Sequence, residues 1–262
     1  MTLVNRRHTR LLHPRPSQAP VPAGVAAEDQ ARIAPSARAA AGADVRDRGT
    51  VGGEAVALGA VTVADAAILT EHAMLGGTAT VRGRAVLSGW SAVIERATVE
   101  GDAWVFGRAV VRGSASIAGH GQVFGEATVA GGAVVDGHAW VHGQALVTDD
   151  AWVTGRAQIG GHAVVCGTAT VSGALRIGGR TVLGDGAEIT CAADYETHHL
   201  SWGDTVTLYR CDGGAVGLGR NENVHGPVTL GRTHLPDPRL RERIEELAEL
   251  WGADTALTVA DG

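Results

Sequence analysis

The chain repeats a six-residue pattern from Val63 to Ile189, and this repeat constrains the fold more than any other feature of the sequence. Steps of six residues over this range give twenty-two positions, and all of them are Val, Ile or Leu. Four residues after most of these positions comes Ala, as at Ala103 and Ala109, and two residues after comes Gly, as at Gly107. A fixed period of this kind is considered first because it decides the architecture.

A period of six fits neither an isolated helix, with 3.6 residues per turn, nor one long strand, with a period of two. It fits a chain that makes one short extended side per hexapeptide and then turns a corner. Three sides close a coil of eighteen residues, so each residue lies over the residue eighteen positions later. One coil buries only three aliphatic side chains, at roughly 1.5–3 kcal/mol each. Stacking of coils is therefore needed to offset the entropy of ordering the backbone.

The corner position is Gly in most repeats, because a turn often needs φ > 0 and Gly adopts that conformation without strain. In the repeats from Val63 to Leu183, the residues that replace Gly there are all acidic: Asp65, Glu71, Glu95, Asp149 and Asp185. Asp tolerates φ > 0 better than most residues. The two glutamates fit this interpretation less well. The pattern predicts that these positions form the corners of a β-solenoid.

The tandem V-x-G-x-A-x pattern resembles the hexapeptide-repeat proteins, and this resemblance implies a left-handed parallel β-helix. Runs such as residues 97–109 (ATVEGDAWVFGRA) resemble the YdcK-like family more closely than the acyltransferases, whose repeats tend to place Gly one residue after the aliphatic residue. The resemblance is specific for fold. It does not specify an activity, because solenoids host many unrelated functions.

The predicted fold is all-β: a left-handed parallel β-helix, a hexapeptide-repeat solenoid of about nine coils, with a small C-terminal cap made of a β-hairpin and an α-helix. Residues 1–30 contain four prolines and no periodicity, which predicts a disordered tail. Residues 31–193 form the predicted solenoid, in which residues 31–62 keep the repeat only loosely. Residues 194–262 form the predicted cap, since open strand edges at the end of a solenoid need covering.

Within the cap, residues 204–211 alternate in polarity and predict a strand, 212–214 a hairpin turn, and 215–220 a returning strand. Residues 205–213 (TVTLYRCDG) also resemble the strand that closes YdcK-like proteins. Residues 227–232 are expected to add a further strand. Asp237-Pro238 predicts a helix start. Leu240, Ile244 and Leu247 then recur at helical spacing, as does Trp251, and Gly252 suits the C-terminal cap.

The net charge of −6 argues against a nucleic-acid or anionic-membrane partner, and no apolar run reaches membrane length. Three cysteines with no C-x-x-C pair argue against a disulfide framework and against a cysteine-based zinc site, so a cytoplasmic location is expected. Arg6-Arg7 is not followed by a hydrophobic stretch, so no signal peptide is expected.

Stacking at eighteen residues predicts that aromatic side chains gather on one face of three consecutive coils. The residues of this predicted face are Trp104, Phe106, Gln122, Phe124, Trp140 and His142. Exposed aromatic clusters usually mark interfaces. The face therefore predicts self-association or a protein partner, and the resemblance to hexapeptide proteins favours a homotrimer. The alternative is that the rings only cover a β-surface, where aromatic residues are common.

His120 and His138 also stack one coil apart, which raises the alternative of a metal site. Hexapeptide carbonic anhydrases bind zinc between subunits, but the spacing His138-x-x-x-His142 differs from the H-x-x-x-x-H of those enzymes. No loop interrupts residues 63–189 to build an acyl-donor pocket. Cys166 is expected to project outward as an inert thiol, and His198 and His199 to pack within the cap.

The sequence therefore predicts a non-catalytic scaffold or interaction module, with no catalytic residue and no cofactor. The alternative is a hexapeptide acyltransferase-like enzyme that depends on acyl-CoA and whose site forms between subunits.

Overall fold

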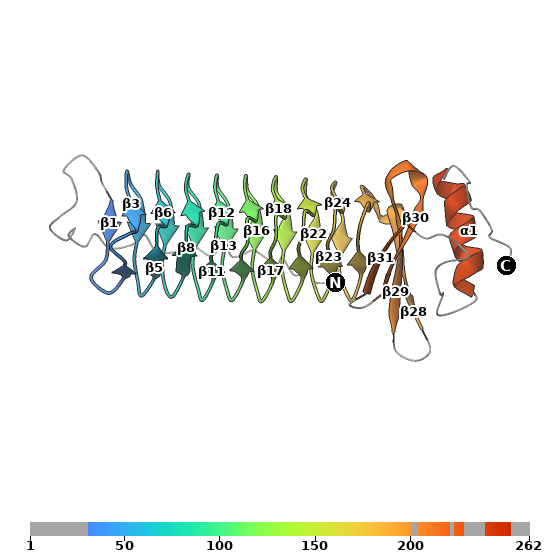
Figure 1. Cartoon of the computed structure of the whole chain (residues 1–262), viewed down its shortest axis with the longest axis horizontal. Helices are drawn as coiled ribbons and strands as arrows, with labels where there is room; N and C mark the ends of the chain where they lie inside the picture. Colours follow the sequence, from blue (N-terminus) through green and yellow to red (C-terminus); the bar gives the residue numbers. More distant parts are fainter. Residues whose placement is uncertain (1–30, 201–203, 221–222, 228–238, 253–262) are drawn as a thin grey trace, which may run out of the picture.

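The computed structural model describes residues 31–200, 204–220, 223–227 and 239–252. The described chain forms an elongated stack of coils, followed by an antiparallel sheet and a helix (Figure 1). The predicted tail over residues 1–30 lies outside the described residues.

The stack consists of three parallel sheets of nine two- to four-residue strands each. Sheet A contains β1 (Arg32–Ile33), β4 (Thr50–Val51), β7 (Ile68–Leu69), β10 (Val86–Leu87), β13 (Trp104–Val105), β16 (Gln122–Val123), β19 (Trp140–Val141), β22 (Gln158–Ile159) and β25 (Arg176–Ile177). Sheet B contains β2 (Arg38–Ala39), β5 (Val56–Gly59), β8 (Met74–Gly77), β11 (Ala92–Val93), β14 (Val110–Val111), β17 (Thr128–Val129), β20 (Leu146–Val147), β23 (Val164–Val165) and β26 (Val182–Leu183). Sheet C contains β3 (Asp44–Val45), β6 (Thr62–Val63), β9 (Thr80–Val81), β12 (Thr98–Val99), β15 (Ser116–Ile117), β18 (Val134–Val135), β21 (Trp152–Val153), β24 (Thr170–Val171) and β27 (Glu188–Ile189).

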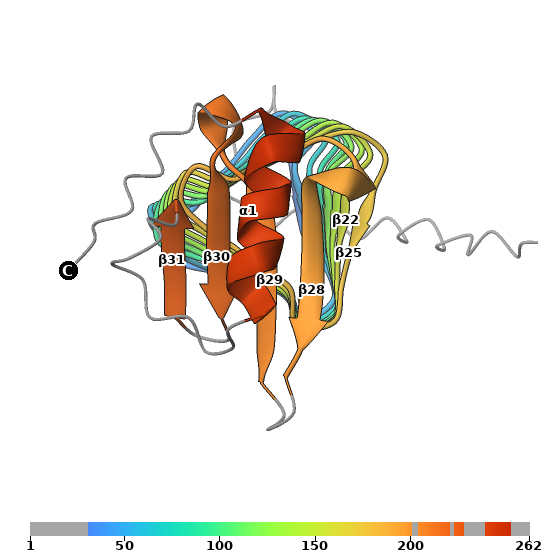
Figure 2. The ribbon, with the colours of Figure 1, turned by 90° about the vertical axis from the view of Figure 1, so that its right-hand side faces the viewer.

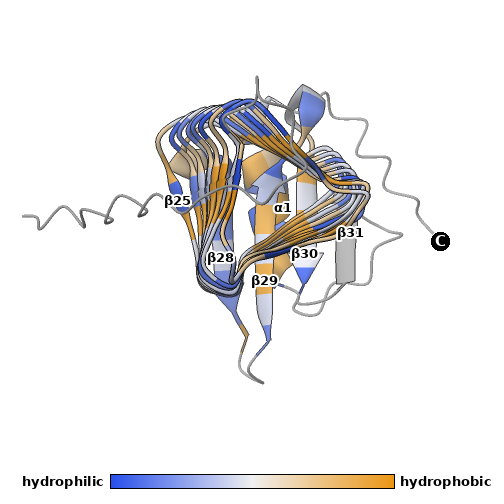
Figure 3. Ribbon diagram, turned by 90° about the vertical axis from the view of Figure 1, so that its left-hand side faces the viewer, coloured by the Kyte–Doolittle hydropathy of each residue, from blue (hydrophilic) through white to orange (hydrophobic). Residues whose placement is uncertain are grey.

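Successive strands of each sheet pair at an offset of eighteen residues, as in Trp104 with Gln122 and Thr98 with Ser116. The offset holds from the pairing of Arg32 with Thr50 to that of Thr170 with Glu188. Viewed along the rod, the coils lie over one another as three sides joined by corners (Figure 3). The predicted fold, a parallel β-solenoid of nine coils with a small antiparallel sheet and one C-terminal helix, is confirmed.

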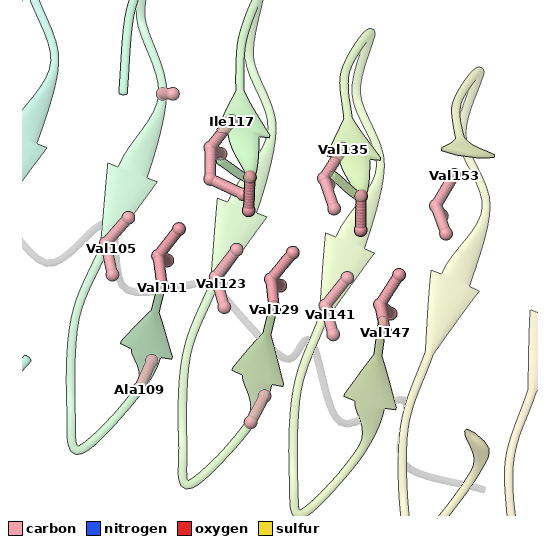
Figure 4. Close-up of a cluster of buried hydrophobic side chains, with 14 of the residues drawn as sticks. Val105, Ala109, Val111, Ile117, Val123, Val129, Val135, Val141, Val147 and Val153 are labelled. Atoms are coloured by element: carbon pink, nitrogen blue, oxygen red, sulfur yellow. The ribbon is translucent and has the colours of Figure 1, made fainter. Parts of the chain in front are cut away.

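The core of the rod is the column of inward aliphatic residues that the repeat predicts. Val105, Val123 and Val141 lie one above another along one side of the interior (Figure 4), and all three are fully buried. Alanines such as Ala109 and Ala127 pack beside them and are also fully buried. A larger side chain would not fit there, because protein interiors are close-packed.

Two buried positions in the alanine column carry a hydroxyl group, Ser91 and Thr181, and the hydroxyl of Thr181 donates to the carbonyl of Gly178 at 2.8 Å. Ser91 is 0% exposed, and its hydroxyl has no hydrogen-bond partner among the described residues, whereas Ala73 and Ala109 occupy the same position one coil away. A buried polar group without a partner costs roughly 1–3 kcal/mol. Ser91→Ala is therefore expected to raise the free energy of unfolding by about 1 kcal/mol. Denaturant titration would measure the change, and a variant less stable than the wild type would contradict it.

The acidic corners have a structural reason beyond their tolerance of φ > 0. Glu71 and Glu95 adopt φ of 60° and 66°. Their carboxylates accept the backbone N–H of Gly89 at 2.6 Å and of Gly113 at 2.8 Å, each one coil ahead. The same contact is made by Asp47, Asp65 and Asp149. These hydrogen bonds between coils offset the backbone strain, so glutamate is accommodated as well as aspartate.

Asp185 departs from the corner role that the sequence predicts for it. It does not adopt positive φ; Gly186 does, at 72°. The reason is that the ninth coil has no further coil above it. The carboxylate of Asp185 instead accepts the N–H of Thr168 at 3.2 Å, and the carbonyl of Gly186 accepts the N–H of Asp212 from the cap at 3.0 Å.

The cap is a four-stranded antiparallel sheet between the ninth coil and a helix (Figure 2). Its elements are η1 (Ala192–Asp194), β28 (Tyr195–His199), β29 (Thr205–Arg210), η2 (Asp212–Gly214), β30 (Val216–Arg220), β31 (Asn223–Pro227) and α1 (Arg239–Trp251). From β29, Tyr209 joins the core of the coils, while Val206 and Leu208 pack with Leu240 and Ile244 of α1. The two faces of the sheet thus bury two different clusters.

The predicted hairpin and helix are confirmed, and the sheet has more strands than the sequence predicts. β28 is not predicted from the sequence, and β31 ends at Pro227, where the predicted strand begins. Residues 228–238, with the predicted helix start at Asp237-Pro238, lie outside the described residues. Gly252 has φ of 71°, as a C-terminal cap requires.

Candidate functional site

The aromatic face predicted from the sequence is centred on a row of outward side chains on sheet A. Trp104 pairs with Gln122, and Gln122 with Trp140, so the three side chains leave the same side of three successive coils. The two tryptophans are 38% and 37% exposed. The row therefore presents two half-exposed indoles with an amide between them.

A second column of rings lies at the corner that follows sheet A. Phe106 and Phe124 stack with centroids 4.9 Å apart and planes 4° apart, and Phe124 stacks on His142 at 5.2 Å and 15°. Offset stacking at this separation is a favourable aromatic geometry. The spacing follows from the rise between coils, about 4.8 Å. The solenoid therefore builds a continuous stack from residues eighteen positions apart.

The tryptophans meet this stack edge to face. Trp104 lies 6.4 Å from Phe106 with planes 82° apart, and Trp140 lies 6.2 Å from Phe124 with planes 72° apart. The Phe planes lie across the rod, because the rings stack along it. The indole planes must therefore run along the rod. The five rings form one cluster. We call this cluster, together with Gln122, the aromatic face.

The stack ends on a glycine that the sequence analysis did not identify. A Cβ added at Gly160 would lie 2.3 Å from Cε1 of His142, so the imidazole rests directly on the Gly160 backbone. The signal is present in the sequence, since Gly160 follows His142 by eighteen residues. Space at this position is what allows His142 to lie parallel to Phe124.

A polar ladder borders the opposite margin of sheet A. The guanidinium of Arg84 donates to Asp102 at 2.5 Å, and Asp102 lies 3.8 Å from His120. His120 stacks on His138 at 4.6 Å with planes 5° apart. The hydrogen bond from Arg84 lowers the pKa of Asp102. The strand β19 separates His138 from His142, so the histidines fall into two groups.

The histidine ladder does not assemble a three-ligand metal site. The lone pairs of stacked imidazoles lie in parallel ring planes and do not converge on one point. Among the described residues, no group of three or more His, Cys, Asp or Glu side chains could hold a metal ion. Within the described residues of one chain, the geometry brings no third metal ligand to His120 and His138.

Cys166 is buried, in contrast to its predicted outward position. It is 8% exposed, and its thiol donates to the carbonyl of Leu183 at 3.6 Å. It lies at the B–C corner, where the neighbouring coil covers the side chain. Burial, with smaller contributions from the charges of Asp149 and Asp185, raises its pKa to about 11. A thiol with a raised pKa is a poor nucleophile at neutral pH.

The cap histidines lie beside the helix contact. Nε2 of His198 is 2.7 Å from Glu196, and Glu196 accepts two hydrogen bonds of 2.8 Å from the guanidinium of Arg243 on α1. The bond from Arg243 lowers the pKa of Glu196. His199 is 3.2 Å from the hydroxyl of Thr205 on the neighbouring strand. Both histidines thus make contacts within the cap, as predicted.

Two further tryptophans of the coils lie outside the aromatic face. Trp90 is 66% exposed and stacks on His72 at 4.0 Å, eighteen residues earlier. Trp152 is 47% exposed on sheet C, where it pairs with Val134 and Thr170. Trp152 stands alone among aliphatic and hydroxyl neighbours, so it offers a matched control for Trp104 and Trp140.

In the described part of the chain, no helix has the length and apolar character needed to cross a membrane. Comparison with protein-family models, curated proteins and solved structures returns no match. The similarity to known proteins is therefore one of architecture: the chain forms a parallel β-solenoid of nine coils, which is consistent with a hexapeptide-repeat β-helix.

Proposed function

We propose that this protein is a non-catalytic, rigid interaction module that binds a partner through its aromatic face. The observation that carries this proposal is the contiguous cluster of five rings around Gln122, in which two indoles remain more than a third exposed. The sequence pattern resembles that of the YdcK-like group, and the cytoplasm is the compartment that the cysteine usage favours.

The side chains of the aromatic face are already ordered before a partner binds. Every ring lies on or beside a strand hydrogen-bonded to the coils above and below. Three of the rings, Phe106, Phe124 and His142, are held by contacts to two or more rings or to one ring and the backbone of Gly160. Binding therefore costs little additional side-chain entropy. Tryptophan is the residue most enriched among those that dominate binding energies.

The lack of acidic and basic side chains on the aromatic face favours a partner surface that is also uncharged. None of the six residues of the face is Asp, Glu, Lys or Arg, and Gln122 supplies one amide that can donate and accept. The simplest partner is a second and third copy of the chain, in the homotrimer that the resemblance to hexapeptide proteins favours.

The test compares three tryptophans on the same type of strand position. Trp140→Ser and Trp104→Ser are expected to lower the mass of the assembly, or to abolish capture of its partner, whereas Trp152→Ser leaves both unchanged. Light scattering after size exclusion measures the mass. A strict monomer that is unaffected by all three substitutions, with no partner captured, would rule out the proposed face. Binding of acyl-CoA that depends on assembly would instead favour the transferase alternative.

A further inference from the structure

The outward row of sheet B is an apolar strip that the aromatic face does not use. From β5 to β23 its outward residues are Val56, Met74, Ala92, Val110, Thr128, Leu146 and Val164. Thr128 is the single polar residue of the seven. Val182, next in the row, is covered by the cap. Contiguous apolar surface of this extent is unusual on a monomer and marks an interface.

The length of the strip limits the area that two copies can bury. Seven strands at about 4.8 Å span roughly 34 Å along the rod. One side of a coil has six residues, which at about 3.3 Å each gives up to about 20 Å across. Two copies related about the sixth coil share the fourth to eighth coils, so five strands overlap over roughly 24 Å, and the area of roughly 480 Å² per partner is that of a weak interface rather than the ~800 Å² of a standard one.

The margin between sheets B and C carries two exposed arginines, Arg96 and Arg112, in its fourth and fifth coils, beside Glu95, whose carboxylate accepts the N–H of Gly113. Arg112, in the fifth coil, is exposed and forms no ion pair among the described residues. Over the seventh to ninth coils the same margin forms a groove of about 590 Å³ lined by Leu146, Val164, Cys166 and three acids. The acids are Asp149, Asp150 and Asp185. Asp150 is exposed and likewise has no ion-pair partner within the described chain.

We propose that sheet B is the interface of a symmetric, antiparallel dimer of this chain. The two-fold axis runs along the strand direction at the sixth coil. This operation places the fifth coil of one copy over the seventh coil of the other. Arg112 of each copy then faces the acidic groove of the second copy, so the same charge pair forms twice. Such reciprocity is the signature of a two-fold interface.

The residues near the axis suit this arrangement. The sixth coil has Ala130, Gly131 and Gly132 at the margin, which allow close approach. Thr128 meets Thr128 of the second copy, so the one polar group in the strip finds a hydroxyl partner. Val110 lies over Leu146 of the second copy. Over the fourth to eighth coils the two strips thus meet apolar residue to apolar residue, apart from the Thr128 pair.

At the margin between sheets A and B, the dimer brings no uncompensated like charges together. Glu126 lies at the level of the axis there, opposite its own counterpart. It is compensated within its own chain by Arg108 at 3.6 Å and by the amide of Gln144, which donates to it at 3.0 Å. The dimer leaves both aromatic faces on sheet A uncovered, so it presents two copies of the surface described under the proposed function.

The test uses charge reversal in a full-length Trp140→Ser background, which removes association through the aromatic face. That background is expected to be a dimer of twice 26.8 kDa. Arg112→Asp and Asp150→Arg should each raise the dimer dissociation constant at least about tenfold, because each places like charges opposite one another. The double variant restores the opposite-charge pair and is expected to recover dimerisation. Sedimentation equilibrium measures all four proteins.

Two matched controls separate the interface from general effects of charge. Arg156→Asp changes an exposed arginine at the C–A corner and should leave the dimer intact. Val110→Glu should dissociate the dimer, whereas Ser116→Glu, outward on sheet C of the same coil, should not. A monomeric Trp140→Ser background would overturn the dimer without touching the proposed aromatic partner. A double variant no tighter than the single ones would also overturn it.

Discussion

Replacing Tyr209 by alanine is expected to lower the free energy of unfolding by about 3–5 kcal/mol, the largest single loss at the cap. Tyr209 projects from β29 into the end of the coil core and is 0% exposed. Its hydroxyl is hydrogen-bonded to the backbone of Gly184. The ring lies so close to Gly217 that a Cβ there would be 2.1 Å from Cε2. Removing the ring leaves a cavity between the cap and the ninth coil.

Tyr209→Phe is the matched control, because it keeps the ring and removes only the hydroxyl. Its expected cost is about 1 kcal/mol, the net value of one hydrogen bond. Denaturant unfolding followed by circular dichroism measures both variants. If the alanine variant were no less stable than the phenylalanine variant, Tyr209 would not be the residue that closes the rod.

Ile117→Ala, in the middle of the rod, is expected to cost about 2–5 kcal/mol. Ile117 is fully buried on β15, between the inward valines of the coils before and after it. The backbone of each coil is held by hydrogen bonds to both neighbours, so it cannot collapse into the space left by the side chain. The cavity term therefore adds to the lost transfer free energy.

Ser116→Ala tests the alternation on the same strand. Ser116 is the outward neighbour of Ile117, and a surface substitution of this kind usually changes stability by less than about 0.5 kcal/mol. The two variants together measure which residue of the pair faces the core. Similar losses for both would contradict the inward and outward assignment of β15.

The coils are predictable from the sequence because the interior of each one is filled by the same types of side chain. A branched residue every six positions and alanine four positions later leave one way to fill the interior, and Val105, Val123 and Val141 occupy it as predicted. The repeat cannot predict Asp185, because the ninth coil lacks the following coil whose amide the other acidic corners bind.

The cap is less predictable because its stability comes from contacts between distant segments. β28 reads Tyr-Glu-Thr-His-His and has no apolar alternation, so its sequence does not indicate a strand. It forms by pairing with β29 and by the contact of Glu196 with Arg243, forty-seven residues away. Cys166 is buried for a similar reason, since the coil above it covers a corner that local sequence leaves open.

The membership of the aromatic face is predictable, whereas its internal geometry is not. Register places Trp104, Gln122 and Trp140 in one row. The orientation of the rings depends on side-chain torsions and on space at Gly160, which a period of eighteen does not specify. The stack of Trp90 on His72 was also accessible from register, but those residues lie outside the face that the sequence highlights.

Both proposed interfaces require residues eighteen positions apart to lie directly over one another. Distances between pairs of spin labels measure this most directly. In a Cys191→Ser background, which removes an exposed thiol, nitroxides are placed at Thr170→Cys and at one of Thr98→Cys, Thr80→Cys or Thr62→Cys. These pairs on sheet C are separated by four, five and six coils. Equal steps of about 4.8 Å are expected, giving mean separations near 19, 24 and 29 Å by double electron–electron resonance. Separations that do not grow by equal steps would contradict the stacked coil, and with it the row of Trp104, Gln122 and Trp140.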